Sequence, residues 1–189
     1  MKYFPGHYVA AGVPFEIKII EQTGNGTWCA QIGCHTDDLT KSTEYRRWPV
    51  ISSRFDLPRG TKESIKMFSP FGGLLYIVSP SHNDPASITV QLSNVISTPT
   101  YDLNDEDRKN KWNSKAKEAK GLWADLAGKH MIISIPSASV RSVDVDTIES
   151  ALELLDKMVL ACHDLRGTQP EWREWLVVDE QISIGYMRE

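Results

Sequence analysis

Residues 15–34 read FEIKIIEQTGNGTWCAQIGC, two runs of alternating character on either side of a glycine-rich turn signal. In the first run, apolar residues at 15, 17 and 19 alternate with charged residues at 16 and 18, which is the period of a half-buried strand. In the second run, alternate residues also share one face: Trp28, Ala30, Ile32 and Cys34. The two runs therefore predict antiparallel strands paired as a hairpin through residues 24–27.

The turn between these runs carries a second signal, because Asn25-Gly26-Thr27 is also a glycosylation sequon. Asn-Gly between two strand-like runs is typical of a tight turn that needs positive φ. We favour the turn, and the sequon stays an alternative.

Further short strands follow along the chain. Strand-like runs at residues 65–68, 74–78 and 87–92 are separated by groups of Pro, Gly, Ser and Asn, which are typical of tight connections. Several short strands at this spacing predict an antiparallel β-sandwich over residues 1–100.

The pattern changes to helices and strands after about residue 98. Residues 102–120 are rich in charged residues. Apolar residues spaced four and three apart begin in this stretch and continue to residue 126, which predicts an amphipathic helix: Trp112, Ala116, Ala119, Trp123 and Leu126. A strand at 131–135 follows. The sequence ends in a predicted strand pair at 175–178 and 181–184.

Between these strands lies the clearest helical pattern of the chain. Its apolar face is Ile148, Ala151, Leu152, Leu155, Met158, Val159, Cys162 and Leu165. Asp146 and Glu149 are spaced as a capping box, and Gly167 stands where a left-handed cap would end the helix. The fold class predicted from these patterns is α+β, with a sandwich over residues 1–100 and an α/β portion over residues 101–189.

Composition excludes several classes of partner. The 189 residues carry a formal net charge of -4 and 41% hydrophobic residues, and no run approaches the ~20 apolar residues of a membrane helix. We therefore expect no nucleic-acid partner and no direct membrane insertion. Three cysteines and an N-terminus without a signal region favour a cytoplasmic or membrane-peripheral location over a secreted one.

The histidines do not form a recognisable metal motif. A zinc peptidase helix carries two histidines one turn apart with a glutamate beside the first, and no His-Glu-x-x-His occurs here. The five histidines are scattered: His7, His35, His82, His130 and His163. Cys34-His35 and Cys162-His163 contain zinc-ligand types, but we favour Cys162 as a buried thiol on the helix face.

Three other features have a structural and a functional interpretation. His35, Asp37 and Asp38 could hold a cation or act as acid and base, but carboxylates after a strand more often shape a turn. Gly72-Gly73 lacks the following helix and the lysine of a phosphate loop, which favours a turn or a close backbone approach. Four tryptophans suit either sugar stacking or core packing, and we favour packing: Trp112, Trp123, Trp172 and Trp175.

Three ordered segments give the chain a family resemblance. The segments are Gln31 to Leu39 (QIGCHTDDL), Ser69 to Ile77 (SPFGGLLYI) and Asp179 to Met187 (DEQISIGYM), with a weaker match at Trp123 to Leu126. Together they resemble the enhancin-like zinc metallopeptidase family, which includes mucin-directed enzymes and the animal TRP-channel-associated factors. The resemblance implies that the α/β portion is the opening part of a thermolysin-like catalytic subdomain.

The resemblance also implies what the chain lacks. In that family the zinc-binding helix follows the part of the sequence that this chain matches. The family's sequence pattern has a histidine at the position of Arg188. We therefore expect this chain to be a truncated peptidase region. No catalytic, cofactor-binding or metal-binding residue is assigned, and zinc is expected only for the parent protein.

Two hypotheses follow from this resemblance. One is a noncatalytic fragment whose parent acts on glycoproteins such as mucins. The alternative is an interaction module that binds a membrane-protein partner or a glycan without catalysis.

Overall fold

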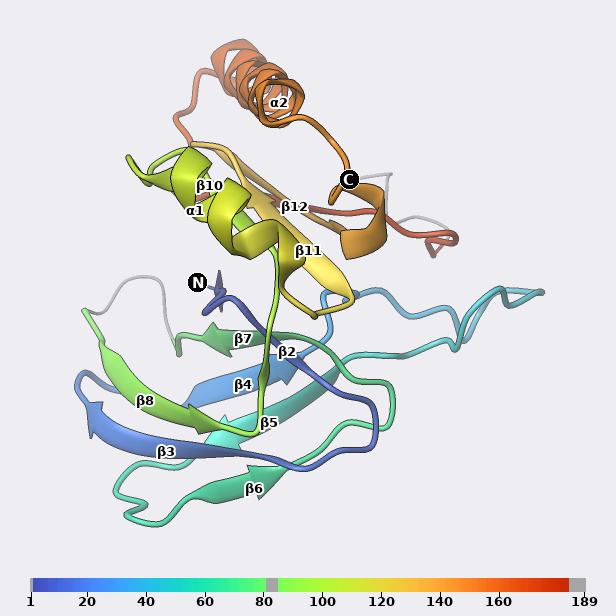
Figure 1. Ribbon diagram of the computed structural model, residues 1–189. Coiled ribbons are helices and arrows are strands. Elements are labelled where there is room, and N and C mark those ends of the chain that lie inside the picture. Colours follow the sequence, from blue (N-terminus) through green and yellow to red (C-terminus); the bar gives the residue numbers. More distant parts are fainter. Residues whose placement is uncertain (1, 81–84, 184–189) are drawn as a thin grey trace. The chain divides into compact units, whose positions relative to one another are not determined.

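The computed structural model describes residues 2–80 and 85–183 (Figure 1). Contacts within the chain group the described residues into two units, the first made of residues 2–96 and 179–183 and the second of residues 97–178. The predicted ranges were 1–100 and 101–189. The observed units differ from them mainly because residues 179–183 group with the first unit.

The first unit is built on two β-sheets. The larger sheet has the strand order β5-β4-β7-β2-β9, with β1 also paired to β7, and the smaller sheet has the order β6-β3-β8. The strands are β1 (Lys2–Tyr3), β2 (His7–Val9), β3 (Phe15–Gln22), β4 (Trp28–Ile32), β5 (Ser53–Leu57), β6 (Ile65–Met67), β7 (Gly73–Val78), β8 (Ile88–Ser93) and β9 (Ile96–Ser97).

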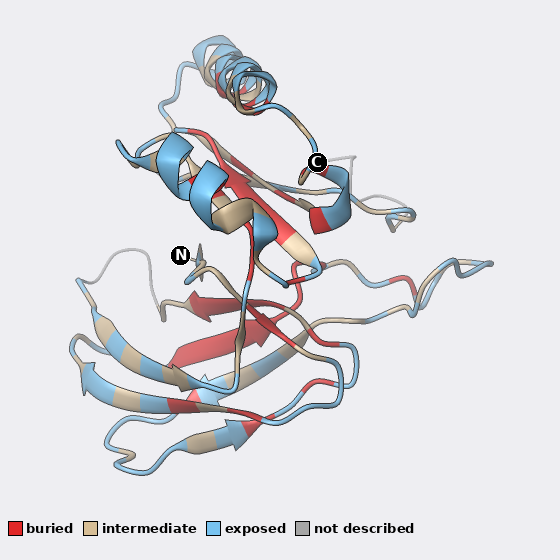
Figure 2. Ribbon diagram, in the orientation of Figure 1, coloured by how far each residue is buried: buried red, intermediate tan, exposed pale blue. Residues whose placement is uncertain are grey.

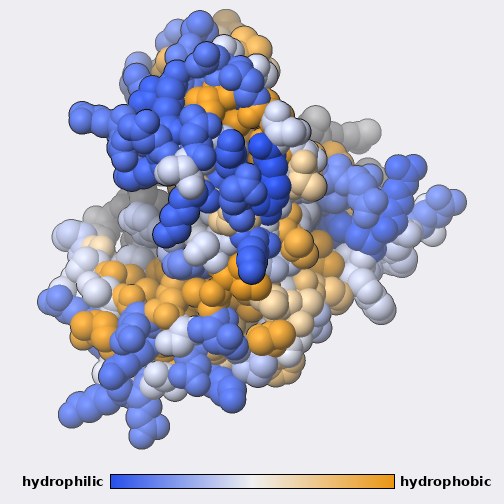
Figure 3. Space-filling view, viewed as in Figure 1, coloured by the Kyte–Doolittle hydropathy of each residue, from blue (hydrophilic) through white to orange (hydrophobic). Residues whose placement is uncertain are grey.

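One apolar core joins the two sheets. It takes Phe15 and Ile17 from the smaller sheet, and Ala30, Ile32 and other residues from the larger one. Figure 2 shows β4 and β7 as the most buried strands of the unit. Half-buried and exposed residues alternate along β8, and hydrophobic and hydrophilic side chains lie side by side on the face of the unit seen in Figure 3. The predicted sandwich and the α+β class are confirmed.

The predicted hairpin between residues 15–19 and 28–34 is wrong. β3 pairs with β6 and β8, while β4 pairs with β5 and β7, so the two runs belong to different sheets. Gly24 and Gly26 do adopt positive φ values of 76° and 86°, as the turn signal predicts. The turn passes from one sheet to the other instead of folding a strand back onto its predecessor.

Gly73 allows two strands to approach closely. Its φ is 134°, and a Cβ atom placed there would lie 2.7 Å from Cα of Gly33. The amide of Gly33 donates to the carbonyl of Leu74 at 2.9 Å, at the end of the β4–β7 pairing. β7 begins at Gly73, so no helix follows the glycines, and the close-approach interpretation is confirmed.

The second unit is a four-stranded sheet with two helices. Its strand order is β10-β11-β12-β13. The elements are β10 (Thr100–Asp102), α1 (Arg108–Ser114), η1 (Ala116–Glu118), β11 (Trp123–Ala127), β12 (Met131–Pro136), η2 (Ser137–Ser139), α2 (Val145–Arg166) and β13 (Glu174–Val177). Trp112 of α1 and Leu152 of α2 belong to the same core as Ala124 and Leu126, so both helices pack on one face of the sheet.

The predicted helix over residues 102–120 is largely wrong. Only Arg108–Ser114 is α-helical, and Trp123 and Leu126 lie in strand β11. The Asp102 side chain accepts the amide of Asn104, and Asp105 accepts the amide of Asp107. These local bonds hold the chain in turns before the helix begins, which is the usual competition of aspartate with helical hydrogen bonding.

The long helix α2 is confirmed, but its cap and its buried face differ from the prediction. The N-cap is Asp144, whose side chain accepts the amide of Thr147, so the Asp146–Glu149 capping box is wrong. Gly167 ends the helix with φ 66°, as predicted. Four residues of the predicted apolar face are exposed rather than buried, Leu165 to 90%: Ala151, Met158, Cys162 and Leu165.

A buried carboxylate fixes α2 to the sheet. Asp156 accepts the amides of Lys129 and His130 at 2.7 Å each and that of Met131 at 3.1 Å, in the turn between β11 and β12. Three backbone donors replace the water that this carboxylate loses on burial.

The predicted final strand pair is half correct. β13 pairs in parallel with β12. Residues 181–183 are not a strand, and Ile184 lies outside the described residues.

We expect Gly73→Ala to lower the stability of the first unit more than Gly12→Ala. Gly12 also has positive φ, 69°, but nothing lies within 4 Å of a Cβ atom built there. The control therefore measures backbone strain alone, about 1–2 kcal/mol. Urea unfolding should show a clearly larger loss for Gly73→Ala, and equal losses would contradict the close-approach account.

Candidate functional site

The long connection between β4 and β5, residues 33–52, folds around its own buried leucine. Leu39 is fully buried, and its amide donates to the carbonyl of Pro49 at 3.1 Å. The carboxylate of Asp38 accepts the amide of Thr40 at 2.8 Å, and the hydroxyl of Tyr45 donates to the carbonyl of Thr40 at 3.0 Å. These bonds give a loop without regular secondary structure a defined path.

Arg47 lies at the centre of a buried ionic group at the end of this loop. Its Nη2 is 2.6 Å from Oδ1 of Asp37, and its Nε is 2.7 Å from Oδ2 of Asp179. The three side chains are only 8%, 6% and 6% exposed. Charge-assisted bonds of this length satisfy a guanidinium well, because the fork of donors meets two separate carboxylates.

His35 completes this group, which we call the Arg47 cluster: Arg47, Asp37, Asp179 and His35. Nε2 of His35 is 3.5 Å from Oδ2 of Asp179. Burial lowers the pKa of His35 below its ordinary value, and the Arg47 charge acts in the same direction against the opposing effect of the two carboxylates. The imidazole is therefore neutral at pH 7 and contributes no second positive charge to the cluster.

The cluster holds an extended piece of chain, residues 179–183, which we call the return segment. The side chain of Gln181 accepts the amide of Arg46 and donates to the carbonyl of Glu44, both at 2.8 Å. The amide of Ser183 donates to Oδ2 of Asp37 at 3.0 Å. Alternate residues of the return segment are thus bound by the loop in the way that a groove binds an extended peptide.

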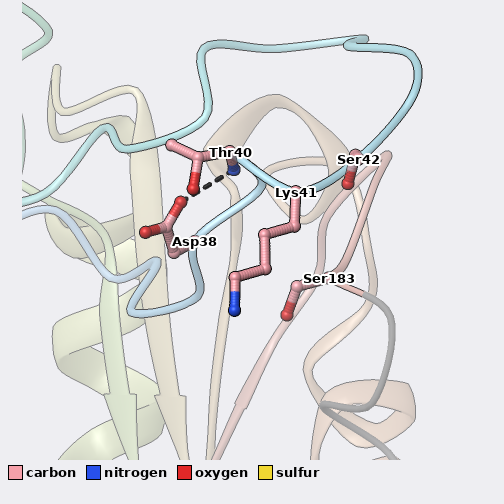
Figure 4. Close-up of a pocket in the computed structure, with 5 residues that line it drawn as sticks. All are labelled: Asp38, Thr40, Lys41, Ser42 and Ser183. Carbon is pink, nitrogen blue, oxygen red and sulfur yellow. Dashed lines mark hydrogen bonds between the residues drawn. The ribbon is translucent and has the colours of Figure 1, made fainter.

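A shallow polar pocket of about 260 Å³ lies between the loop and the return segment (Figure 4). It is lined by Asp38, Thr40, Lys41, Ser42 and Ser183. These hydroxyl, carboxylate and ammonium groups form hydrogen bonds readily. The pocket therefore suits binding of a polar group.

His35, Asp37 and Asp38, considered together as a possible cation or acid–base site, have different roles in the structure. Asp38 shapes a turn, which confirms the structural interpretation for that residue. His35 lies beside Asp179, and Asp37 pairs with Arg47; neither Arg47 nor Asp179 was predicted from the sequence. The one available signal was that Asp179 opens a segment of the family resemblance.

The described residues do not form a zinc centre of the kind that the resemblance implies for the parent protein. Cys34 and His35 are buried in the first unit, whereas Cys162 is an exposed residue of α2 in the second, so Cys162 as a buried thiol is wrong. Nδ1 of His163 bonds the hydroxyl of Thr168 at 2.8 Å. Within residues 2–80 and 85–183 no three His, Cys, Asp or Glu side chains converge to hold a metal ion, and His82 lies outside the described residues.

The four tryptophans considered for sugar stacking have different surroundings. Trp112 is a core residue and meets Tyr101 edge to face, with 5.7 Å between ring centroids. Trp175 donates from Nε1 to the hydroxyl of Ser134 at 2.8 Å. Core packing is confirmed for Trp112, while Trp123 and Trp175 are half-buried and Trp172 is exposed.

Membrane insertion finds no support among the helices. Neither α1 nor α2, nor any other helix of the described part of the chain, combines the length and apolar character needed to cross a bilayer.

Comparison with known proteins gives two adjoining family matches. Residues 3–93 match the N-terminal domain of M60-like peptidases, and residues 94–188 match the family described as peptidase M60, enhancin and enhancin-like. Among curated proteins, human TRPM8 channel-associated factor 1 is 31% identical over 188 residues. That alignment covers 98% of this chain but 19% of the relative, so the chain spans about one fifth of the relative's length.

Solved structures with low identity share the fold. The M60 catalytic domain of Clostridium perfringens ZmpC, solved with the sialyl T antigen, is 13% identical with a TM-score of 0.64, over 95% of this chain and 40% of that one. IMPa from Pseudomonas aeruginosa, solved with an O-glycopeptide, is 20% identical with a TM-score of 0.61, over 82% of this chain and 18% of that one.

We expect Arg47→Met to destabilise the first unit by about 3–5 kcal/mol, because it leaves two carboxylates buried without their counterion. Arg46→Met is the matched control, since Arg46 is exposed and its hydrogen bond to Gln181 comes from the backbone amide, which the substitution keeps. Thermal and urea unfolding of both variants test this. Equal stability of the two variants would show that the Arg47 cluster contributes little.

Proposed function

Because the chain belongs to the peptidase M60, enhancin and enhancin-like family, we propose that its 189 residues act as the scaffold and recognition part of an M60-like domain and carry out no hydrolysis by themselves. The family membership rests on the match of residues 94–188, preceded by the M60-like N-terminal domain at residues 3–93.

The observation that carries this proposal is how the histidines are used. His35 is committed to Asp179, His163 contacts Thr168, and the sequence contains no His-Glu-x-x-His. A peptidase metal needs ligands that converge from neighbouring turns and leave a position open for water. These side chains supply packing and turn geometry in place of that arrangement.

We propose that the larger protein in which such a scaffold would act has O-glycosylated proteins as its substrates. The support is that two structures with this fold were solved with an O-glycopeptide and with the sialyl T antigen. The polar pocket beside the return segment offers hydroxyl, carboxylate and ammonium groups, which are the groups that bind sugar hydroxyls.

We expect no cleavage when the purified chain is incubated with an O-glycopeptide and added zinc. The IMPa metallopeptidase serves as the positive control under the same conditions, and mass spectrometry detects the products. Chelator-sensitive cleavage by the purified chain would overturn the noncatalytic proposal.

The second candidate is an interaction module that binds a membrane channel at the membrane periphery. It is favoured by the 31% identity to human TRPM8 channel-associated factor 1 across almost the whole chain. The loop of residues 33–52 offers an exposed contact residue, because Trp48 is 69% exposed and lies beside Phe71 with 6.1 Å between ring centroids.

The channel-binding candidate predicts retention of the chain by immobilised, detergent-solubilised TRPM8. Trp48→Ala should reduce the bound fraction on the order of tenfold, as expected for an exposed aromatic anchor. Ile20→Ala changes another exposed apolar residue, on β3, and should bind like the original chain. Absence of binding, or equal loss in both variants, would contradict this candidate.

A further inference from the structure

The return segment is attached to the first unit mainly by polar contacts. Residues 181–183 are not a strand, and Glu180 and Ile182 are exposed, Ile182 to 47%. Its hydrogen bonds to the loop of residues 33–52 run through the Arg47 cluster and the side chain of Gln181. A segment with few buried apolar contacts opens locally, at a lower cost in free energy than unfolding of the whole unit. Its attachment therefore responds to changes in these polar contacts.

His35 is the member of the Arg47 cluster that changes its charge near neutral pH, because the ordinary pKa of histidine lies there. Its ring is buried, with Nδ1 3.5 Å from Sγ of Cys34 and Nε2 3.5 Å from Oδ2 of Asp179. A neutral ring that carries its proton on Nε2 suits both neighbours, since it points a donor at the carboxylate and accepts from the thiol.

A protonated ring suits the same place poorly. A second proton, on Nδ1, removes the acceptor that faces the thiol of Cys34. On the other side, Oδ2 of Asp179 already accepts from Nε of Arg47 at 2.7 Å, so an imidazolium would share that oxygen with a guanidinium. Burial also withholds the water that would solvate the new charge. Protonation of His35 therefore favours a state in which the ring reaches water.

The other ionisable groups around the ring do not reverse this preference. The two carboxylates of the Arg47 cluster favour a charged His35 and the guanidinium opposes it, but burial is the largest effect, and the pKa of His35 is lowered. On the neighbouring strand β2, burial and the Cys34 thiol raise the pKa of Tyr8, so its phenol stays neutral.

We propose that the return segment is a latch that acid releases, with protonation of His35 as the trigger. Detachment removes Asp179 from the ring and opens the ring to water. Arg47 keeps its pairing with Asp37, because both belong to the loop, at 2.6 Å between Nη2 and Oδ1. The loop thus retains a neutralised ion pair after the segment has left.

The direction of the pH effect follows from proton binding. In the detached state His35 regains the ordinary histidine pKa of 6.5, and in the attached state its pKa is lower. Below pH 6.5 the detached state therefore binds more protons, so attachment is fully stable above this pH and weakens as the pH falls below it. One proton changes the opening equilibrium by at most about tenfold per pH unit.

Hydrogen exchange on the full chain tests the latch. The amides of Arg46 and Ser183, which bond across the loop and the segment, are measured at about pH 7.5 and about pH 5.5 and corrected for the intrinsic rate at each pH. Their protection should fall by about threefold to tenfold on acidification. His35→Gln should abolish this fall, because an amide does not titrate.

His7→Gln is the matched control. Burial lowers the pKa of His7 as well, but this residue lies on β2, outside the loop and the return segment, so the variant should keep the fall. At both pH values the amides of β4 and β7 should stay more protected than the two reporters, because the opening is local.

A titration of the His35 ring by nuclear magnetic resonance needs no substitution, and decides the matter if His35→Gln does not fold. Its midpoint in the original chain should lie below 6.5. The latch is overturned by a midpoint at or above that value, by equal protection at both pH values, by a fall that persists in His35→Gln, or by one that disappears in His7→Gln.

Discussion

A guanidinium held out of water between two carboxylates is the interaction on which the first unit depends. Arg47 reaches Asp37 in its own loop and Asp179 at the far end of the chain, and all three side chains are nearly inaccessible to solvent. An unpaired charge in such a place costs several kcal/mol, so neither carboxylate is tolerated there without the arginine. The loop of residues 33–52 and the return segment therefore take up their positions together.

The three segments of the family resemblance meet in the first unit. Residues 31–39 and 69–77 are joined by the pairing of β4 with β7 and by the approach of Gly33 to Gly73. The described part of the third segment, residues 179–183, is bound to the first through Asp37, Arg47 and the side chain of Gln181. Each of the three segments thus supplies one part of a single structural unit.

Sequence patterns predicted the parts of this fold that depend on local periodicity. The sandwich strands, β12 and α2 with its glycine cap follow from alternation, helical spacing and positive φ at Gly167. The pairing of β3 with β8 instead of β4 is a contact between distant residues, and nothing in residues 15–34 encodes it. Turns held by local aspartate bonds replace most of the helix expected over residues 102–120. The predicted apolar face of α2 combined the buried residues Ile148, Leu152 and Val159 with exposed ones such as Met158 and Leu165, because apolar residues lie on two sides of this helix. The Arg47 cluster was half visible, since His35 and Asp37 stood out but their partners lie in distant positions.

Hydrogen exchange at two backbone amides measures whether the Arg47 cluster holds the return segment against the loop. The amide of Arg46 donates to the side chain of Gln181, and that of Ser183 donates to Asp37, so both report whether the return segment is bound to the loop. If the Arg47 cluster holds this segment in place, both amides should exchange at least on the order of 100-fold more slowly than in an unstructured peptide. Exchange of both at unstructured rates, while the amides of β4 and β7 stay protected, would contradict the account.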